Sequence, residues 1–271
     1  MLVVDAQVHI WSSGPPTNPS HRQVPSFTKD ELLQEMDAAG VDAAVLHPPG
    51  WDPDGNQFSV NAAQQHPKRL AVLGHFPLDK PESRQLIDGW KQRPGMLGLR
   101  FALNQPHQRE WWTDGTMDWL WPAAERAQIP IALLAAEHLP GVARVAEQYP
   151  DLKLAIDHLG RAGRVQDAPA FANLPDLLAL AKYPNVAVKA TGAPSYSSEA
   201  YPYRNIQPYL RQIYDAFGPE RMFWGTDITR MPCSWKQCVT LFTEELPWLR
   251  ESDKELIMGR AVCNWLGWQL T

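Results

Sequence analysis

Eight short apolar segments recur along this chain, and each is separated from the next by a stretch long enough for one helix. Apolar strands that alternate with helices are typical of parallel βα units. Eight such units in 271 residues predict an α/β fold, a (β/α)8 barrel that forms a single domain over residues 1–271. The predicted strands are Val3–Ile10, Ala43–His47, Ala71–Phe76, Met96–Phe101, Ile129–Ala135, Leu154–His158, Val186–Ala190 and Met222–Asp227.

The connections between these predicted elements differ at the two ends of the strands. Links from helix to strand are short and contain Gly or Pro, and one predicted helix begins after Thr28 and ends at Gly40. Because loops that follow the strands build the site of a barrel enzyme, longer links there indicate an enzyme with its site at that end. The long links are Trp11–Phe27, Pro48–Asn56, Ala102–Gly115, Thr191–Tyr203 and Ile228–Ser234.

The composition limits which partners and which cellular compartment we expect for this protein. A net charge of −5 argues against nucleic acid, and the apolar runs are far shorter than the ~20 residues of a membrane span. The amino-terminal residues contain no secretory signal, so we expect a cytoplasmic protein. Cys233, Cys238 and Cys263 lack CxxC spacing and are expected to be reduced thiols. We expect a small-molecule substrate, and a homodimer formed through the outer helices is compatible with the pattern.

Ionisable side chains at the strand ends form the predicted catalytic group. Gln7 and His9 are two residues apart in a strand, so both are expected to face the barrel axis. Asp227 ends the last strand, where a carboxylate can take a proton from water that attacks a carbonyl. His158 and His9 would polarise that carbonyl, and Gln7 could donate its amide hydrogens.

Structural roles compete with these assignments. Either histidine alone could be a satisfied core residue, and Asp227 could cap a turn or pair with Lys189. We expect Asp5 and Asp157 to face away from the catalytic side chains, Asp157 because it alternates with His158 along its strand, and we interpret both as structural.

Several cations and aromatic residues are candidates for substrate binding. A guanidinium group grips a carboxylate with two parallel hydrogen bonds, so it both attracts and orients an anion. Lys189 is either a further cation over the site or a buried partner of Asp227. The predicted substrate-binding residues are Arg100, Arg230, Arg204, Lys189, Trp11, His75 and Tyr196.

Three motifs resemble those of the amidohydrolase superfamily, in the branch that contains 2-pyrone-4,6-dicarboxylate lactonase and sugar-acid lactonases. They are Asp5-Ala6-Gln7-Val8-His9, Ile156-Asp157-His158-Leu159-Gly160 and Phe223-Trp224-Gly225-Thr226-Asp227, at the first, sixth and eighth strands. The resemblance implies a barrel hydrolase that opens a cyclic carboxylic ester.

The chain departs from the superfamily pattern at its metal ligands. Gln7 stands where the first histidine is normal, Arg100 replaces a Lys or Glu that could bridge two metals, and the fifth strand has no His. A neutral amide is a weak ligand for Zn²⁺. We therefore expect that no cofactor is required. The alternative is a single Zn²⁺ or other divalent ion held by His9, His158 and Asp227.

Other functions stay open at this point. The same constellation would serve a cyclic amide hydrolase, and related metal-dependent enzymes decarboxylate aromatic acids. Against decarboxylation, His158 is followed by Leu159 and not by an acidic residue. Loss of metal ligands would also be compatible with a barrel that only binds its ligand.

Overall fold

A computed structural model describes residues 1–103, 105–161 and 165–270, and it confirms the predicted barrel. Eight parallel strands follow one another around the sheet in chain order, so each strand pairs with the next one in sequence. The strands are β1 (Val4–Val8), β2 (Ala43–Leu46), β3 (Leu70–Gly74), β4 (Met96–Ala102), β5 (Ile131–Leu134), β6 (Leu154–Ile156), β7 (Val186–Thr191) and β8 (Met222–Gly225).

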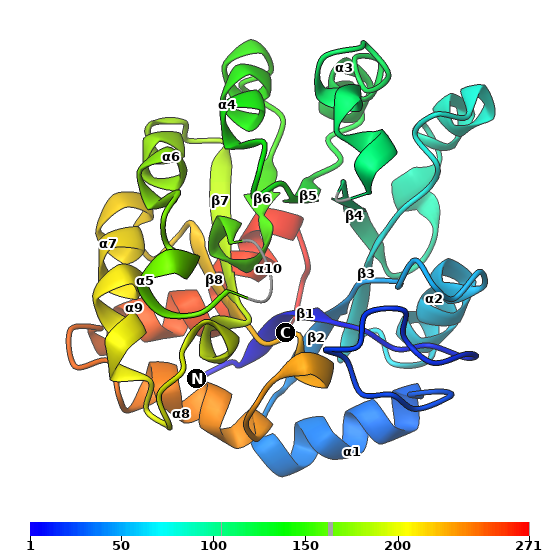
Figure 1. Ribbon diagram of the computed structural model, residues 1–271. Coiled ribbons are helices and arrows are strands. Elements are labelled where there is room, and N and C mark those ends of the chain that lie inside the picture. Colours follow the sequence, from blue (N-terminus) through cyan, green and yellow to red (C-terminus); the bar gives the residue numbers. More distant parts are fainter. Residues whose placement is uncertain (104, 162–164, 271) are drawn as a thin grey trace.

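Helices form an outer ring around these strands (Figure 1). The link from β3 to β4 differs, because it contains two 3₁₀ turns, η1 (Pro81–Leu86) and η2 (Trp90–Gln92). None of the described helices combines the length and the apolar character that crossing a membrane would require. The helices are α1 (Lys29–Ala39), α2 (Gly55–Gln65), α3 (Leu120–Arg126), α4 (Leu139–Gln148), α5 (Asp167–Ala170), α6 (Leu174–Ala179), α7 (Gln207–Phe217), α8 (Trp235–Thr243), α9 (Glu251–Glu255) and α10 (Ala261–Leu266).

Local sequence signals explain the ends of α1. The Thr28 side chain accepts a hydrogen bond from the Glu31 N–H, and Glu31 accepts one from the Thr28 N–H, which forms a capping box. Gly40 ends the helix with a φ of 76°, a left-handed conformation that glycine adopts without strain. Both ends of this helix were predicted from the sequence.

The barrel has two apolar cores. One lies between the strands and the outer helices, and the other fills the inside of the barrel. Small side chains such as Ala6, Ala71 and Ala155 line the inner core, and α10 together with Trp268 packs against them. In Figure 1, α10 lies in the central opening of the ring of strands. The interior is therefore packed, so the polar chemistry is confined to the ends of the strands.

Contacts between β1 and β8 close the barrel. The Asp227 N–H donates to the Gln7 carbonyl at 2.8 Å, and the Thr226 N–H donates to Oδ1 of Asp5 at 2.9 Å. Asp5 also accepts from the Trp235 indole of α8 at 3.0 Å, which supports its predicted structural role. Burial raises the pKa of Asp5 to about 7 although these donors favour the ionised form.

An irregularity of β1 separates side chains that strict alternation would place together. The register of β1 against β2 shifts between Asp5 and Val8. Asp5 contacts Trp235 on the outer side, whereas Gln7 contacts Lys189 inside the barrel. The shift therefore re-aims a side chain next to the site, as β-bulges often do.

Replacing Gly225 by Ala should destabilise the closure between β1 and β8. A Cβ atom at this position would lie 2.6 Å from Cγ2 of Thr191 and 2.9 Å from the backbone N of Ala6. We expect a loss of about 1–3 kcal/mol in the free energy of unfolding, measured by urea denaturation. Gly89→Ala is the control, because its Cβ would meet nothing within 4 Å. Equal stability of the two variants would contradict this account of the closure.

Candidate active site

A cavity of about 1040 Å³ opens at the carboxyl-terminal end of the strands. Its walls come from the strand ends and from the loops that follow them, which is where barrel enzymes place their active sites. Two aspartates and three arginines are among its described lining residues, together with several histidines and aromatic residues. The polar side chains of the lining include His9, His21, His75, Asp79, Arg100, His107, His158, Arg161, Tyr196, Asp227 and Arg230.

Asp227 follows the end of β8 in a left-handed conformation, with a φ of 58°. Its Oδ2 accepts a hydrogen bond from Nε of Arg230 at 2.5 Å. Burial alone would raise the pKa of Asp227, but the positive charge of Arg230 beside the carboxylate opposes burial, and the pKa lies well below its ordinary value. Asp227 is therefore ionised at neutral pH, and its buried Oδ1 has no hydrogen-bond partner among the described residues.

His9 presents a lone pair to that carboxylate. Its Nδ1 lies 2.5 Å from the His47 carbonyl oxygen, which only accepts, so Nδ1 bears the proton. Burial lowers the pKa of His9 to about 4, so the ring is neutral at pH 7. Its Nε2 lies 3.3 Å from Oδ1 of Asp227. Two atoms that both carry lone pairs thus face each other at the cavity wall.

A buried ion network lies beneath the cavity. Lys189 is 2% exposed, and its Nζ lies 2.7 Å from Oδ1 of Asp157 and 2.6 Å from Oε1 of Gln7. Oδ2 of Asp157 accepts from Nε of Arg100 at 2.9 Å. Burial would raise the pKa of Asp157, but Lys189 and Arg100 hold it well below its ordinary value.

This network corrects two interpretations made from the sequence. Asp157 does not face away from the site, because β6 ends at Ile156 and the chain then turns, with φ angles of 55° and 57° at His158 and Leu159. Alternation therefore no longer applies at Asp157. The hydrogen-bonded carboxylate partner of Lys189 is Asp157 and not Asp227.

The position of Lys189 also determines what Gln7 offers to His158. Because Lys189 donates to Oε1 of Gln7, the amide nitrogen of Gln7 is the end that contacts Nε2 of His158, at 3.0 Å. Nδ1 of His158 lies 2.9 Å from the Thr191 hydroxyl and 3.0 Å from Nη2 of Arg230. Burial and Arg230 lower the pKa of His158 to about 3. Both ring nitrogens are occupied, so neither presents a free N–H to the cavity in this arrangement.

Three side chains of the cavity wall are arranged as metal ligands would be. His9, His21 and Asp227 are buried, and each has a ligand atom within 4.8 Å of those of the other two. Oδ1 of Asp227 is unpaired, and the lone pair of Nε2 of His9 points toward it. These residues fit a divalent transition-metal ion. This set differs from the predicted set by having His21 in place of His158.

The structure brings together most of the residues that were predicted from the sequence. Gln7 and Lys189 are outside the cavity lining and lie in the ion network. Trp11 is fully buried, packs against Phe27 and Trp51, and does not line the cavity. Arg204 is exposed on η8 (Arg204–Ile206), also outside the lining. The predicted residues that line the cavity are His9, His75, Arg100, His158, Tyr196, Asp227 and Arg230.

The sequence did not identify His21, Trp51 and Arg161 as site residues. His21 lies in the loop between β1 and α1, whose length was the available signal. Arg161 directly follows the Asp157–Gly160 motif and is fully buried, and its Nη2 has no partner among the described residues. Its Nε donates to the Leu159 carbonyl at 2.6 Å, so the unpaired end is held in place.

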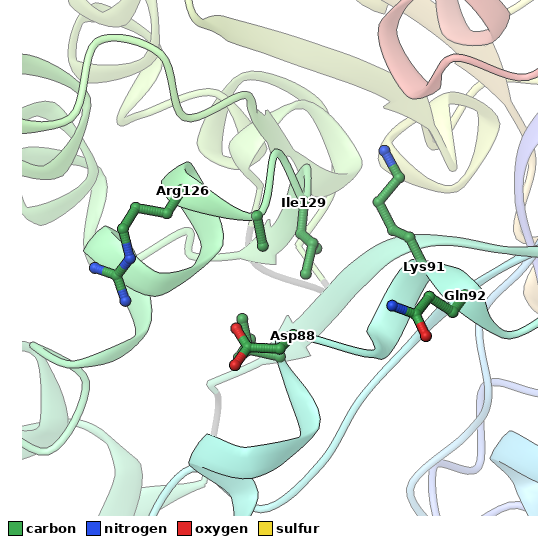
Figure 2. Close-up of a pocket in the computed structure, with 7 residues that line it drawn as sticks. Asp88, Lys91, Gln92, Arg126 and Ile129 are labelled. Atoms are coloured by element: carbon green, nitrogen blue, oxygen red, sulfur yellow. The ribbon is translucent and has the colours of Figure 1, made fainter.

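A second, smaller cavity of about 210 Å³ lies at the other end of the barrel. Its lining includes Asp88, Lys91 and Gln92 ahead of β4, and Arg126 and Ile129 ahead of β5 (Figure 2). The amino-terminal end of a barrel contributes to stability, whereas catalysis occurs at the opposite end. We therefore place the active site in the larger cavity.

Asp157 should make the fold sensitive to acid. Its folded pKa is lowered, so its contribution to stability is complete above the unfolded pKa of about 3.9 and is lost as the pH falls below that value. Asp157→Asn removes one partner of a buried pair and should cost about 3–5 kcal/mol at pH 7, measured by urea denaturation. The variant should also depend less on pH between pH 5 and pH 3. Asp215→Asn, on the exposed Arg211–Asp215 pair, is the control, and an equal loss there would refute the assignment.

Comparisons with known proteins identify the family of this chain. Residues 4–261 match the amidohydrolase family model. A 4-sulfomuconolactone hydrolase from Hydrogenophaga intermedia is 28% identical over 247 residues, which cover 82% of this chain and 73% of that protein. An L-fucono-1,5-lactonase from Burkholderia ambifaria is 23% identical over 230 residues, which cover 83% of this chain and 79% of that protein.

Solved structures support the fold. A crystal structure of an amidohydrolase from Burkholderia multivorans with bound zinc superposes with a TM-score of 0.86 at 20% identity. The superposition covers 99% of this chain and all of that one. Because the family match spans nearly the whole chain, the chain belongs to the amidohydrolase family, as its three strand-end motifs indicated.

Proposed function

We propose that this enzyme hydrolyses a small anionic lactone, with Asp227 as the general base. Two relatives that match most of the chain are lactone hydrolases by name, which favours a cyclic ester as the substrate. The cavity of about 1040 Å³ is in the size range of small-molecule sites.

The unpaired Oδ1 of Asp227 is the observation on which the proposal rests. Arg230 holds Oδ2, so the carboxylate has a fixed orientation and Oδ1 is left to accept a proton. A water molecule hydrogen-bonded to Oδ1 attacks the lactone carbonyl carbon and transfers its proton to Asp227. The bond between that carbon and the ring oxygen then breaks, and the ring oxygen receives the proton from Asp227 as the hydroxyl of the opened acid.

Guanidinium groups supply the positive charge that the substrate and the intermediate require. Arg100 and Arg230 line the cavity and use their Nε atoms to bind Asp157 and Asp227. Nη1 of Arg230 also donates to the Ser195 hydroxyl and its Nη2 lies 3.0 Å from His158, but each of these nitrogens carries a second N–H. We assign stabilisation of the carbonyl oxygen to these two residues. His9 and His158 were predicted to polarise the carbonyl, but their N–H groups are directed to the His47 carbonyl and the Thr191 hydroxyl, so neither histidine donates to the substrate in this scheme.

Arg161 is the candidate partner for the substrate anion. It has no hydrogen-bonded carboxylate among the described residues, and burial lowers its pKa to about 10, which still leaves it charged at pH 7. A buried guanidinium nitrogen without a hydrogen-bond partner is costly, so an anionic ligand that pairs with it gains binding energy.

A divalent cation would add to this chemistry. When bound by His9, His21 and Asp227, it would place positive charge beside the carbonyl oxygen and lower the pKa of a neighbouring water. Asp227 has two lone pairs on each carboxylate oxygen, so a ligand role is compatible with proton acceptance.

Asp227→Asn should lower the turnover number for lactone hydrolysis by about 100-fold or more, because the amide cannot accept the proton. Acid release from a panel of carboxylated and sugar-acid lactones, followed with a pH indicator with and without a chelator, measures the effect. Asp215→Asn, exposed on α7, is the control and should keep the activity. Unchanged turnover in Asp227→Asn would refute the mechanism. If no lactone is opened, assays for cyclic amide cleavage and for CO₂ release from dihydroxybenzoates identify the alternative reaction.

Arg161→Met should raise the KM for a carboxylated lactone by about 10-fold or more, since a hydrogen bond to a charged group is worth about 1.5–3 kcal/mol. The KM for an uncharged lactone of the same ring size should change little. Arg204→Met is the control, because Arg204 is exposed outside the cavity lining. An equal rise in KM for both lactones would remove Arg161 from substrate recognition, and a melting curve shows whether the variant is folded.

A further inference from the structure

Two cysteines contact each other outside the active-site cavity. Cys233 lies in the loop that follows β8, and Cys238 lies on the outer helix α8 (Figure 1). Their Sγ atoms are 3.5 Å apart, and neither residue lines the cavity. Both are free thiols. The contact is therefore not explained by the chemistry assigned to the cavity.

The surrounding hydrogen bonds keep the two sulfur atoms close. Cys238 is buried in the outer core, and its carbonyl oxygen accepts a hydrogen bond from the Trp224 indole of β8 at 3.1 Å. Cys233 directly precedes Ser234, whose side chain caps α8 by accepting a hydrogen bond from the Gln237 N–H. The cap holds the loop against the first turn of the helix, where Cys238 lies.

The two thiols differ in access and in acidity. Cys233 is half-buried between the exposed Pro232 and Ser234, whereas Cys238 is 2% exposed. The hydrogen bond from the Cys238 thiol, together with the nearby Tyr203 hydroxyl, outweighs burial and lowers the pKa of Cys233 to about 7. The same hydrogen bond and burial raise the pKa of Cys238 well above its ordinary value. Cys233 therefore supplies a reactive thiolate, and Cys238 keeps its proton.

Cys263 shows the opposite character in the same chain. It is buried on α10 in the inner core, whereas Cys233 and Cys238 belong to the outer core. Burial raises the pKa of Cys263 to about 11. Cys263 is therefore protonated and shielded at neutral pH, as is typical of a structural cysteine.

A metal site is a less suitable interpretation of the two thiols. Thiolates suit soft metal ions, but structural zinc sites use four protein ligands. Among the residues that the structure describes, no third histidine, cysteine or carboxylate has a ligand atom close enough to both sulfur atoms to complete such a set. An acidic, accessible thiol beside a second thiol is instead the arrangement of a redox-active pair.

We propose that Cys233 and Cys238 form a reversible disulfide when the protein meets a peroxide. The Cys233 thiolate attacks one peroxide oxygen, the O–O bond breaks, and Cys233 becomes a sulfenic acid. The leaving oxygen takes up a proton from water, which replaces the proton that Cys233 gave up. Cys238 then attacks the Cys233 sulfur, the S–O bond breaks, and the hydroxide leaves as water with the Cys238 proton. The two thiols lose two electrons in total, and the peroxide gains them.

The disulfide joins the loop after β8 to α8. The sulfur atoms must approach from 3.5 Å to about 2.05 Å, a movement that side-chain rotation and a small shift of the loop can supply. The same loop contains Arg230, which lines the cavity. Oxidation therefore ties a segment of the cavity wall to an outer helix, and a dithiol reverses it by thiol–disulfide exchange.

Hydrogen peroxide treatment of the full chain tests the proposal. The reduced protein is reacted with excess hydrogen peroxide and alkylated under denaturing conditions, and its mass is measured. Because the chain has 3 cysteines, we expect one alkyl group per treated chain in place of three. Dithiothreitol, added after the peroxide is removed, should restore three.

Tryptic peptides identify the linked residues. Trypsin cleaves after lysine and arginine, so each cysteine lies in a separate peptide, 231–236, 237–250 or 261–271. We expect a disulfide between the first two peptides and none to the third. Iodoacetamide applied to the reduced, native chain at pH 7 should label Cys233 about 10-fold or more faster than Cys263, because the thiolate is the nucleophile.

Matched variants separate the attacking thiol from the resolving thiol. Cys238→Ser should leave Cys233 as a sulfenic acid, which dimedone traps on peptide 231–236. Cys233→Ser should protect Cys238 from oxidation. Cys263→Ser is the control and should form the disulfide as the unmodified chain does. Melting curves of the reduced variants show whether each is folded, and the peptide map of the unmodified chain decides if one is not.

The outcomes are independent of the proposed function. Three free thiols after treatment, a disulfide to Cys263 or a disulfide between two chains overturns the proposal. Dimedone labelling of Cys238 in Cys233→Ser, without labelling of Cys233 in Cys238→Ser, overturns the assigned order of attack. Lactone hydrolysis by the reduced chain is measured separately, so either the disulfide or the proposed function can fail alone.

Discussion

The burial of Lys189 is the constraint on which the arrangement of this site depends. An ammonium group that is 2% exposed must find its hydrogen bonds and a counter-charge inside the protein, and Asp157 and Gln7 provide them. Because Lys189 takes the amide oxygen of Gln7, the amide nitrogen turns to His158. One buried charge thus determines the orientation of an amide and of an imidazole at the cavity wall.

The distribution of counter-charges gives the three cavity arginines different roles. Arg100 and Arg230 are each held by a carboxylate, Asp157 and Asp227 respectively, so their positions are fixed before a substrate arrives. Gly192 makes this possible for Arg230, because a Cβ atom there would lie 2.3 Å from Nη2 of Arg230. Arg161 has no hydrogen-bonded carboxylate among the described residues, and its buried Nη2 has no hydrogen-bond partner there.

The fold could be predicted because the barrel repeats one pattern eight times. Each apolar segment is identifiable alone, and the long loops that follow the strands indicate the functional end of the barrel. Asp227, His9, Arg100 and Arg230 were found for the same reason, since they end or follow strands. The resemblance of the three strand-end motifs to a known family indicated the class of reaction, but it did not predict the contacts between side chains.

The errors arose where the regular pattern stops. The turn after Ile156 changes the direction of Asp157 without any change in the hydrophobic pattern. His21 lies in the loop between β1 and α1. The hydrophobic pattern of the strands carries no information on whether a loop residue lies near the end of β8. The hydrogen-bond partners of His158, Gln7 and Thr191, come from other strands. No short motif around His158 encodes them.

The position of the site across the closure between β1 and β8 has a consequence for biosynthesis. His9 and His21 leave the ribosome early, whereas Asp227 and Arg230 follow about 200 residues later. Until β8 docks beside β1, the emerging chain has two histidines without their carboxylate and no assembled cavity. Completion of the barrel and completion of the site are thus the same event, so a partly made chain cannot act on the substrate before it has folded.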